Sequence, residues 1–222
     1  VSATLAVGND FSYMASRIGI INYKTLLLGT SFDYDKQMVV LIDKSCADPS
    51  SPRYTETAAS TAVKIIEHLK GNCLMLFTSY RMLREIREEM RHRVEHNFHS
   101  QDVLTATGAM NSYLSDNDSI LMGTHSFWQG IDIPGDRLRG VIMMKLPFAV
   151  PDTPLMQARI DRITQSGLNA FVTLQLPEAV IKFRQGMGRL IRSRKDRGVF
   201  AVLDNRVHTK AYGKAFLKSI PV

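Results

Sequence analysis

The fold is decided by one stretch near the end of the chain, Gln185-Gly186-Met187-Gly188-Arg189-Leu190-Ile191-Arg192. It follows an apolar run that opens at Pro177, and it leads into a predicted strand over residues 199–203. If the stretch is helical, its spacing of i, i+4 and i+7 places Gln185, Arg189 and Arg192 on one face. Two guanidiniums and an amide, with no acid nearby, form a cluster of donors that suits phosphate oxygens. The alternative is a basic helix end that faces solvent.

The two glycines of this stretch favour the phosphate interpretation. In a helix interior, Gly186 and Gly188 each cost about 1 kcal/mol relative to alanine. A helix that carries both indicates that another body approaches its backbone closely.

Charge is concentrated around the same stretch. The net charge is +7, but residues 1–180 carry 17 Lys/Arg against 19 Asp/Glu, whereas residues 181–222 carry 11 against 2. Such a local excess indicates a polyanionic partner, either a nucleotide or a nucleic acid. A basic tail that only aids solubility is the alternative, but apolar residues alternate with these charges and indicate folded structure.

Composition sets the class of protein. With 222 residues and 45% apolar residues, the chain can bury a full core as one large or two small domains, and disorder is disfavoured. Cys46 and Cys73 have no metal-binding spacing, so we interpret both as free thiols. The sequence shows no signal peptide and no membrane-spanning run, so no membrane partner is expected.

Helical and extended patterns alternate along the chain. Apolar runs predict strands at 24–28, 37–43, 73–77, 102–105, 120–124, 141–144 and 199–203. Helical patterns predict helices at 11–18, 55–70, after Ser79, at 154–165 and at 210–219, with a loop at 125–136. Short connections between alternating elements indicate an α/β fold, a parallel sheet with helices on both faces.

Polar residues follow several of these strands, where ligands of parallel sheets bind. The three stretches are Thr78-Ser79-Tyr80, residues 124–132 and Asp204-Asn205-Arg206. The first two collect hydroxyls and glycines, which bind phosphate through O–H and backbone N–H groups.

Taken together, these stretches resemble the second RecA-like domain of superfamily 2 helicases, and most closely the DinG/XPD-like branch of DNA helicases. The resembling motifs, in chain order, are Ser2-Ala3-Thr4 (motif III), Phe77-Thr78-Ser79-Tyr80 (motif IV), residues 123–135 (motif V), residues 185–192 (motif VI) and the sequel Val202-Leu203-Asp204-Asn205-Arg206. Motif V departs at Gln129, where many relatives carry Glu. The resemblance spans almost the whole chain, so we expect one RecA-like domain over residues 1–222.

The resemblance implies an ATP-dependent motor. ATP and Mg²⁺ would be bound mainly by a first RecA-like domain, because the chain contains no G-x-x-x-x-G-K-[ST] phosphate loop, no Asp-Glu-x-His motif and no four-cysteine cluster set. We therefore expect the C-terminal piece of a longer helicase, inactive alone, in the bacterial cytoplasm near the nucleoid. Arg189 and Arg192 would act as arginine fingers. The other implied nucleotide-side residues are Gln185, Gly130, Asp132 and Gly188.

The same resemblance implies a track for single-stranded DNA. Thr78, Ser79, Thr124 and Ser126 would contact phosphates, and Tyr80 and Trp128 could stack on bases. Several alternatives stay open: helix capping for Ser79 and Thr124, turn capping for Asp132, and packing for the two aromatics, which we favour for Tyr80. The competing class of function is a RecA-like domain that binds nucleic acid without catalysis.

Overall fold

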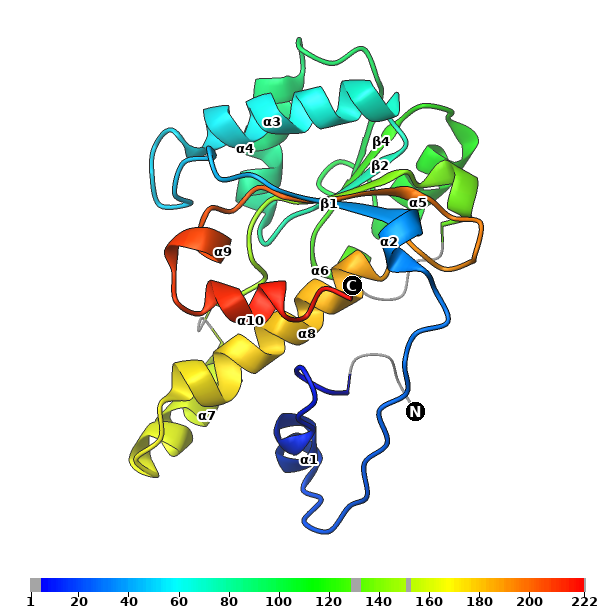
Figure 1. Cartoon of the computed structure of the whole chain (residues 1–222). Coiled ribbons are helices and arrows are strands. Elements are labelled where there is room, and N and C mark those ends of the chain that lie inside the picture. Colours follow the sequence, from blue (N-terminus) through cyan, green and yellow to red (C-terminus); the bar gives the residue numbers. More distant parts are fainter. Residues whose placement is uncertain (1–4, 129–132, 151–152, 222) are drawn as a thin grey trace.

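The computed structural model describes residues 5–128, 133–150 and 153–221 (Figure 1). Its centre is a six-stranded sheet of order β1-β6-β5-β2-β4-β3, in which every pairing is parallel. The strands are β1 (Met38–Ile42), β2 (Cys73–Leu76), β3 (Phe98–Ser100), β4 (Ile120–Gly123), β5 (Gly140–Met143) and β6 (Gly198–Val202). The predicted parallel α/β fold is confirmed.

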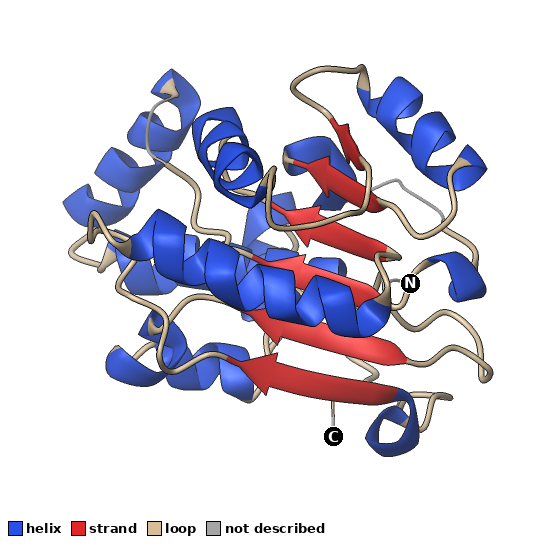
Figure 2. Cartoon of the chain, turned by 90° about the horizontal axis from the view of Figure 1, so that it is seen from above, coloured by secondary structure: helices blue, strands red, loops and turns tan. Residues whose placement is uncertain are grey.

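Helices cover both faces of the sheet (Figures 1 and 2). One face packs against α3 (Tyr54–Leu69) and α4 (Tyr80–Met90). The opposite face packs against α5 (Ala106–Ser115), α6 (His125–Trp128), α8 (Leu176–Met187) and α10 (Gly213–Leu217). The remaining helices are α1 (Ser12–Ile18), α2 (Tyr34–Gln37), α7 (Pro154–Gln165) and α9 (Arg206–Thr209), with a 3₁₀ turn η1 (Gly135–Arg137) and a π-helical segment η2 (Phe171–Gln175).

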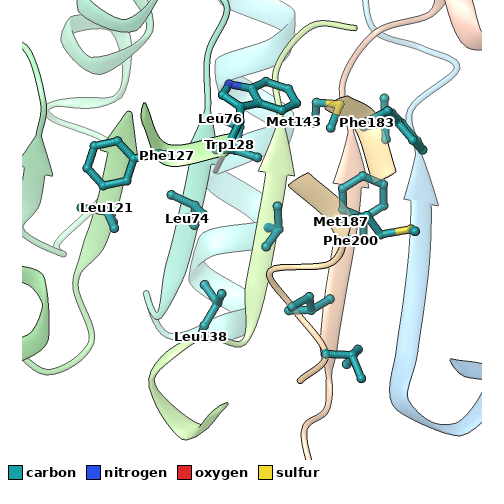
Figure 3. Packing of buried hydrophobic residues seen from close by; sticks show 14 of the residues in the cluster. Leu74, Leu76, Leu121, Phe127, Trp128, Leu138, Met143, Phe183, Met187 and Phe200 are labelled. Atoms are coloured by element: carbon teal, nitrogen blue, oxygen red, sulfur yellow. The ribbon is translucent and has the colours of Figure 1, made fainter. Parts of the chain in front are cut away.

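The central strands are apolar on both sides because both faces are covered. In β2, Leu74 and Leu76 enter the core beside α8, whereas Cys73 and Met75 enter the core beside α3 and α4. Figure 3 shows the first of these cores, where Phe183 of α8 lies over the strands. Both cysteines are buried free thiols, as expected.

Three sequence-based expectations for local structure are wrong. Residues 24–28 form no strand and lie exposed, and the strand expected at 102–105 lies earlier, at Phe98–Ser100, where it pairs with β4. The helix expected over 210–219 is shorter, because α10 spans only Gly213–Leu217. An added Cβ at Gly213 would lie 2.0 Å from the carbonyl oxygen of Val207. This contact requires a glycine at the start of α10, which follows the separate short helix α9.

Candidate functional site

The arginine stretch does not form one continuous helix. Helix α8 ends at Met187 with Gly188 as its C-cap, and Arg189 follows in a turn whose N–H donates to the carbonyl of Gly186. Beyond it, the backbone N–H of Arg192 donates to the carboxylate of Asp196 instead of to a helical carbonyl. The prediction of one helical face is therefore wrong, because a side-chain acceptor competes with the helical hydrogen bonds.

Close packing accounts for the glycine at position 186 of α8. An added Cβ would lie 2.9 Å from Leu76 Cδ1, 3.2 Å from Met143 Cε and 3.2 Å from Trp128 Cε3. The expected close approach to this backbone is confirmed, and the approaching body is the sheet and Trp128 rather than a ligand. Gly188, in contrast, is exposed at the end of the helix.

The side chain of Arg189 is hydrogen-bonded to the segment that follows β4. Its guanidinium Nε and Nη2 donate to the carbonyl oxygen of Trp128 at 3.2 Å and 2.9 Å. The side chain is half-buried, and this burial lowers the pKa of Arg189. Gln185 and Arg192 are half-buried as well, and burial lowers the pKa of Arg192 although Asp196 opposes the shift. All three side chains are therefore partly dehydrated.

An acid does lie beside the arginines, contrary to expectation. The carboxylate of Asp196 accepts hydrogen bonds from Arg192 N (2.7 Å), Ser193 N (2.7 Å) and Ser193 Oγ (2.6 Å). Burial alone would raise the pKa of Asp196, but these hydrogen bonds outweigh it and the pKa is lowered. The carboxylate thus shapes the loop that carries Arg192.

Gln37 supports the same loop from the other side. Its side chain is 3% exposed, and its Nε2 donates to the carbonyls of Ser193 (2.8 Å) and Asp196 (3.0 Å). Its Oε1 accepts from the backbone N–H of Asp33 at 3.0 Å. Gly135 lies against the same carboxylate, since its added Cβ would be 2.2 Å from Asp196 Oδ1. Sequence analysis missed Gln37, because nothing local in the sequence links it to a loop more than 150 residues away.

The hydroxyl residues lie at the opposite, carboxyl edge of the sheet. Leu76 pairs with Gly123, so the polar turns that begin after β2 and β4 lie side by side. Thr78 is half-buried, whereas Ser79 and Ser126 are exposed. Ser79 Oγ also accepts from Met82 N at 3.3 Å, which confirms the capping role.

Gln101, which sequence analysis also missed, fixes the start of α6. Its Oε1 accepts from Thr124 N (2.8 Å) and Thr124 Oγ1 (3.1 Å), and its Nε2 donates to Ser126 Oγ at 2.7 Å. Thr124 is therefore buried, and its hydroxyl donates to Gln101. The expected phosphate contact by Thr124 stays a prediction. Residues 125–128 form α6 rather than a loop.

The two aromatics of these turns differ in exposure. Trp128 is only 3% exposed and its indole N–H donates to the carbonyl of Phe77 at 3.2 Å, so it packs in the core and cannot stack on a base (Figure 3). Tyr80 is 43% exposed at the carboxyl edge and is accessible. Of the two roles left open for Trp128, the packing role is the one observed, because the short helix α6 turns its ring inward.

Some expected residues cannot be placed. Ser2-Ala3-Thr4, Gly130 and Asp132 lie outside the described residues. Within the described ranges, no helix is long and apolar enough to cross a membrane, and no group of three His, Cys, Asp or Glu side chains is arranged to hold a metal ion.

Comparison with known proteins identifies the family. A family model described as a helicase C-terminal domain matches residues 62–222. The chain belongs to this family, as the C-terminal RecA-like domain of DinG/XPD-like superfamily 2 helicases.

Individual relatives agree with this assignment. The chain is 36% identical over 230 residues to the 3'-5' exonuclease DinG of Bacillus subtilis and 38% identical over 220 residues to the ATP-dependent DNA helicase YoaA of Escherichia coli. Each match covers 99% of this chain but only 25% and 35% of the respective relative. An XPD helicase structure matches with a TM-score of 0.69 at 18% identity, over 98% of this chain and 40% of that one. Dbp5 of S. cerevisiae, bound to RNA and ADP BeF3, matches with a TM-score of 0.58 at 15% identity, over 97% and 48%.

Proposed function

We propose that this chain is the second motor domain of an ATP-dependent DNA helicase and supplies arginine fingers to an ATP site shared with a first RecA-like domain. The observation that carries the proposal is the anchoring of the arginine turn. Arg189 is held by the carbonyl of Trp128, and the loop after Arg192 is held by Asp196. The guanidinium of Arg189 and the backbone of Arg192 are thus held in place, and both side chains are partly dehydrated, which strengthens their interaction with an anion.

The donor set fits the phosphates of ATP. Guanidinium groups match phosphate oxygens in geometry. The carboxylate oxygens of Asp196 accept hydrogen bonds from Arg192 N and from Ser193, which fixes the backbone of the loop. ATP with Mg²⁺, held mainly by the first RecA-like domain, would supply the phosphoryl group that is transferred to water. Arg189 and Arg192 would stabilise negative charge on that group, and Gln185 would donate to a phosphate oxygen.

Single-stranded DNA would cross the carboxyl edge of the sheet. Thr78, Ser79 and Ser126 would donate hydroxyl hydrogens to phosphates, and Tyr80 would stack on a base. Contacts to the DNA backbone do not depend on the base sequence, as is required of a motor that moves along any DNA. The arginine turn joins α8 to β6, and Arg189 bonds to the carbonyl of Trp128 in α6, the helix that also carries Ser126, so the proposed ATP and DNA contacts would meet at α6.

The decisive experiment compares two arginines of the same loop. In the full-length parent, Arg192→Ala should reduce DNA-stimulated ATP hydrolysis by about 10³-fold or more, the usual effect of losing an arginine finger. The exposed neighbour Arg194 is the matched control, and Arg194→Ala should retain near-normal turnover. The isolated chain should hydrolyse no ATP. Normal turnover by Arg192→Ala would refute the finger assignment, and no ATP hydrolysis by the parent would favour a non-catalytic binding domain.

A further inference from the structure

A second polar feature lies beside Ser79, on the face of the sheet that α3 and α4 cover. It is an open pocket of about 470 Å³ at the carboxyl edge. Its wall is formed by the loop after β1, the first residues of α3 and α4, and the residue that follows Met144. The side chains that matter for its chemistry are Ser51, Thr55, Ser79, Arg81, Glu85 and Lys145.

Lys145 is the unusual member of this wall. Its ammonium donates to the carbonyl of Pro49 at 3.1 Å and lies 4.6 Å from the ring centroid of Tyr54. Among the described residues, no carboxylate lies within ion-pair distance of it. The side chain is half-buried, and burial together with Arg206 lowers the pKa of Lys145, although the more distant carboxylates of Asp204, Glu85 and Asp48 oppose the shift. A partly dehydrated cation without a carboxylate partner is costly unless an anion joins it.

The lysine is held in place rather than mobile. The Tyr54 hydroxyl donates to the carbonyl of Met144, which fixes the ring under the ammonium and the backbone just before Lys145. An ammonium carries three N–H donors, and the hydrogen bond to Pro49 uses one of them. Because the Tyr54 ring covers another side of the ammonium, at least one donor remains for a ligand in the pocket.

The rest of the wall also favours an anion. Ser79 Oγ accepts from Met82 N, so its hydroxyl hydrogen is available for donation. Glu85 opposes an anion, but it forms an exposed pair with Arg81 at 2.8 Å, and the two charges offset each other. Lys145 thus supplies the net positive charge of the pocket. Helices α3 and α4 both begin there, and their N-terminal ends reinforce that charge.

We propose that this pocket binds a phosphate group, with Lys145 as its charged donor and Ser79 as its hydroxyl donor. The inference rests on the proposed function for one point, the source of the phosphate. Ser79 belongs both to this pocket and to the proposed DNA track, so a strand that contacts Thr78 and Ser79 places a phosphate at the pocket. The same chemistry would also bind free inorganic phosphate, and the experiment separates the two sources.

The test measures binding of a fluorescent oligothymidylate to the chain by anisotropy at several salt concentrations. Lys145→Met keeps the aliphatic volume and removes the charge; it should weaken binding about 3- to 10-fold and reduce the salt slope by about 0.7. Lys145→Arg should restore most of the affinity. Lys64→Met is the control, because Lys64 is exposed on α3 and does not line the pocket. Circular dichroism verifies that each variant is folded.

Titration with inorganic phosphate, followed by NMR of the pocket amides, completes the test. If Lys145→Met binds the oligonucleotide as tightly as the unsubstituted chain does, and phosphate shifts no pocket amide, the phosphate site is refuted while the DNA track stands. If the unsubstituted chain does not bind the oligonucleotide, but phosphate shifts the amides around Ser79 in that chain and not in Lys145→Met, the site is confirmed for free phosphate and the DNA track fails. If neither ligand binds, both proposals are overturned.

Discussion

Gln37 provides a sharp test of how the arginine loop is held. Gln37→Ala removes three hydrogen bonds, two to the carbonyls of Ser193 and Asp196 and one from the N–H of Asp33. Each is worth about 1 kcal/mol net, and buried groups left without partners add to the loss, so unfolding free energy should fall by about 2–4 kcal/mol. For a chain of this size, the midpoint of thermal unfolding should fall by about 5–12 °C.

The assay is urea and thermal unfolding of the chain, monitored by circular dichroism. Gln157→Ala is the control, because Gln157 is exposed and bonds only to Asp161 within α7; it should change stability by less than about 0.5 kcal/mol. Gln37→Glu would place a carboxylate against two carbonyl oxygens, which raises its folded-state pKa above about 4.3. Its stability should therefore be higher in acid and fall as pH rises through that folded-state pKa. A Gln37→Ala variant as stable as Gln157→Ala would refute the reasoning.

Three further predictions concern the same loop and the carboxyl edge. Asp196→Asn should lower the free energy of unfolding by about 2–4 kcal/mol at pH 7, measured by urea unfolding. Because the folded-state pKa of Asp196 is lowered, this stabilisation is present above the unfolded pKa of about 3.9 and is lost as pH falls through the folded-state pKa. The unsubstituted chain and the variant should therefore become equally stable in acid. Gly135→Ala places a Cβ 2.2 Å from Asp196 Oδ1, whose hydrogen bonds prevent it from moving, and should cost about 1–3 kcal/mol in thermal unfolding. Gln101→Ala releases Ser126 and should weaken binding of single-stranded DNA about 2- to 5-fold in anisotropy, with an unchanged affinity contradicting the DNA track.

The architecture was predictable because it depends on patterns that a sequence displays directly. Uninterrupted apolar runs such as residues 73–77 indicated strands buried on both faces, and their alternation with helices indicated a parallel sheet. The packing of α4 was also predictable, since Met82, Leu83, Ile86 and Met90 repeat at helical spacing and are all buried.

The details of the candidate site were not predictable, because they depend on contacts between distant residues. Beyond the end of α8, the N–H of Arg192 donates to Asp196, and Gln37 reaches the same loop from another part of the chain. The exposure of Tyr80 and the burial of Trp128 depend on how α6 turns over the sheet. Residue type and local spacing carry no information on these tertiary contacts.

The position of β1 at the edge of the sheet has a consequence for how the protein forms during synthesis. β1 pairs with β6, and its first residue, Met38, lies opposite Gly198, so the partner strand is translated 160 residues later. The first strand of this sheet to be synthesised must therefore remain unpaired until nearly all of the sheet has been made. Its Val-Val-Leu-Ile run is apolar, and closing so long a loop is slow. During that interval β1 is a point at which nascent chains can associate wrongly, and a chain interrupted before residue 198 leaves it permanently without a partner.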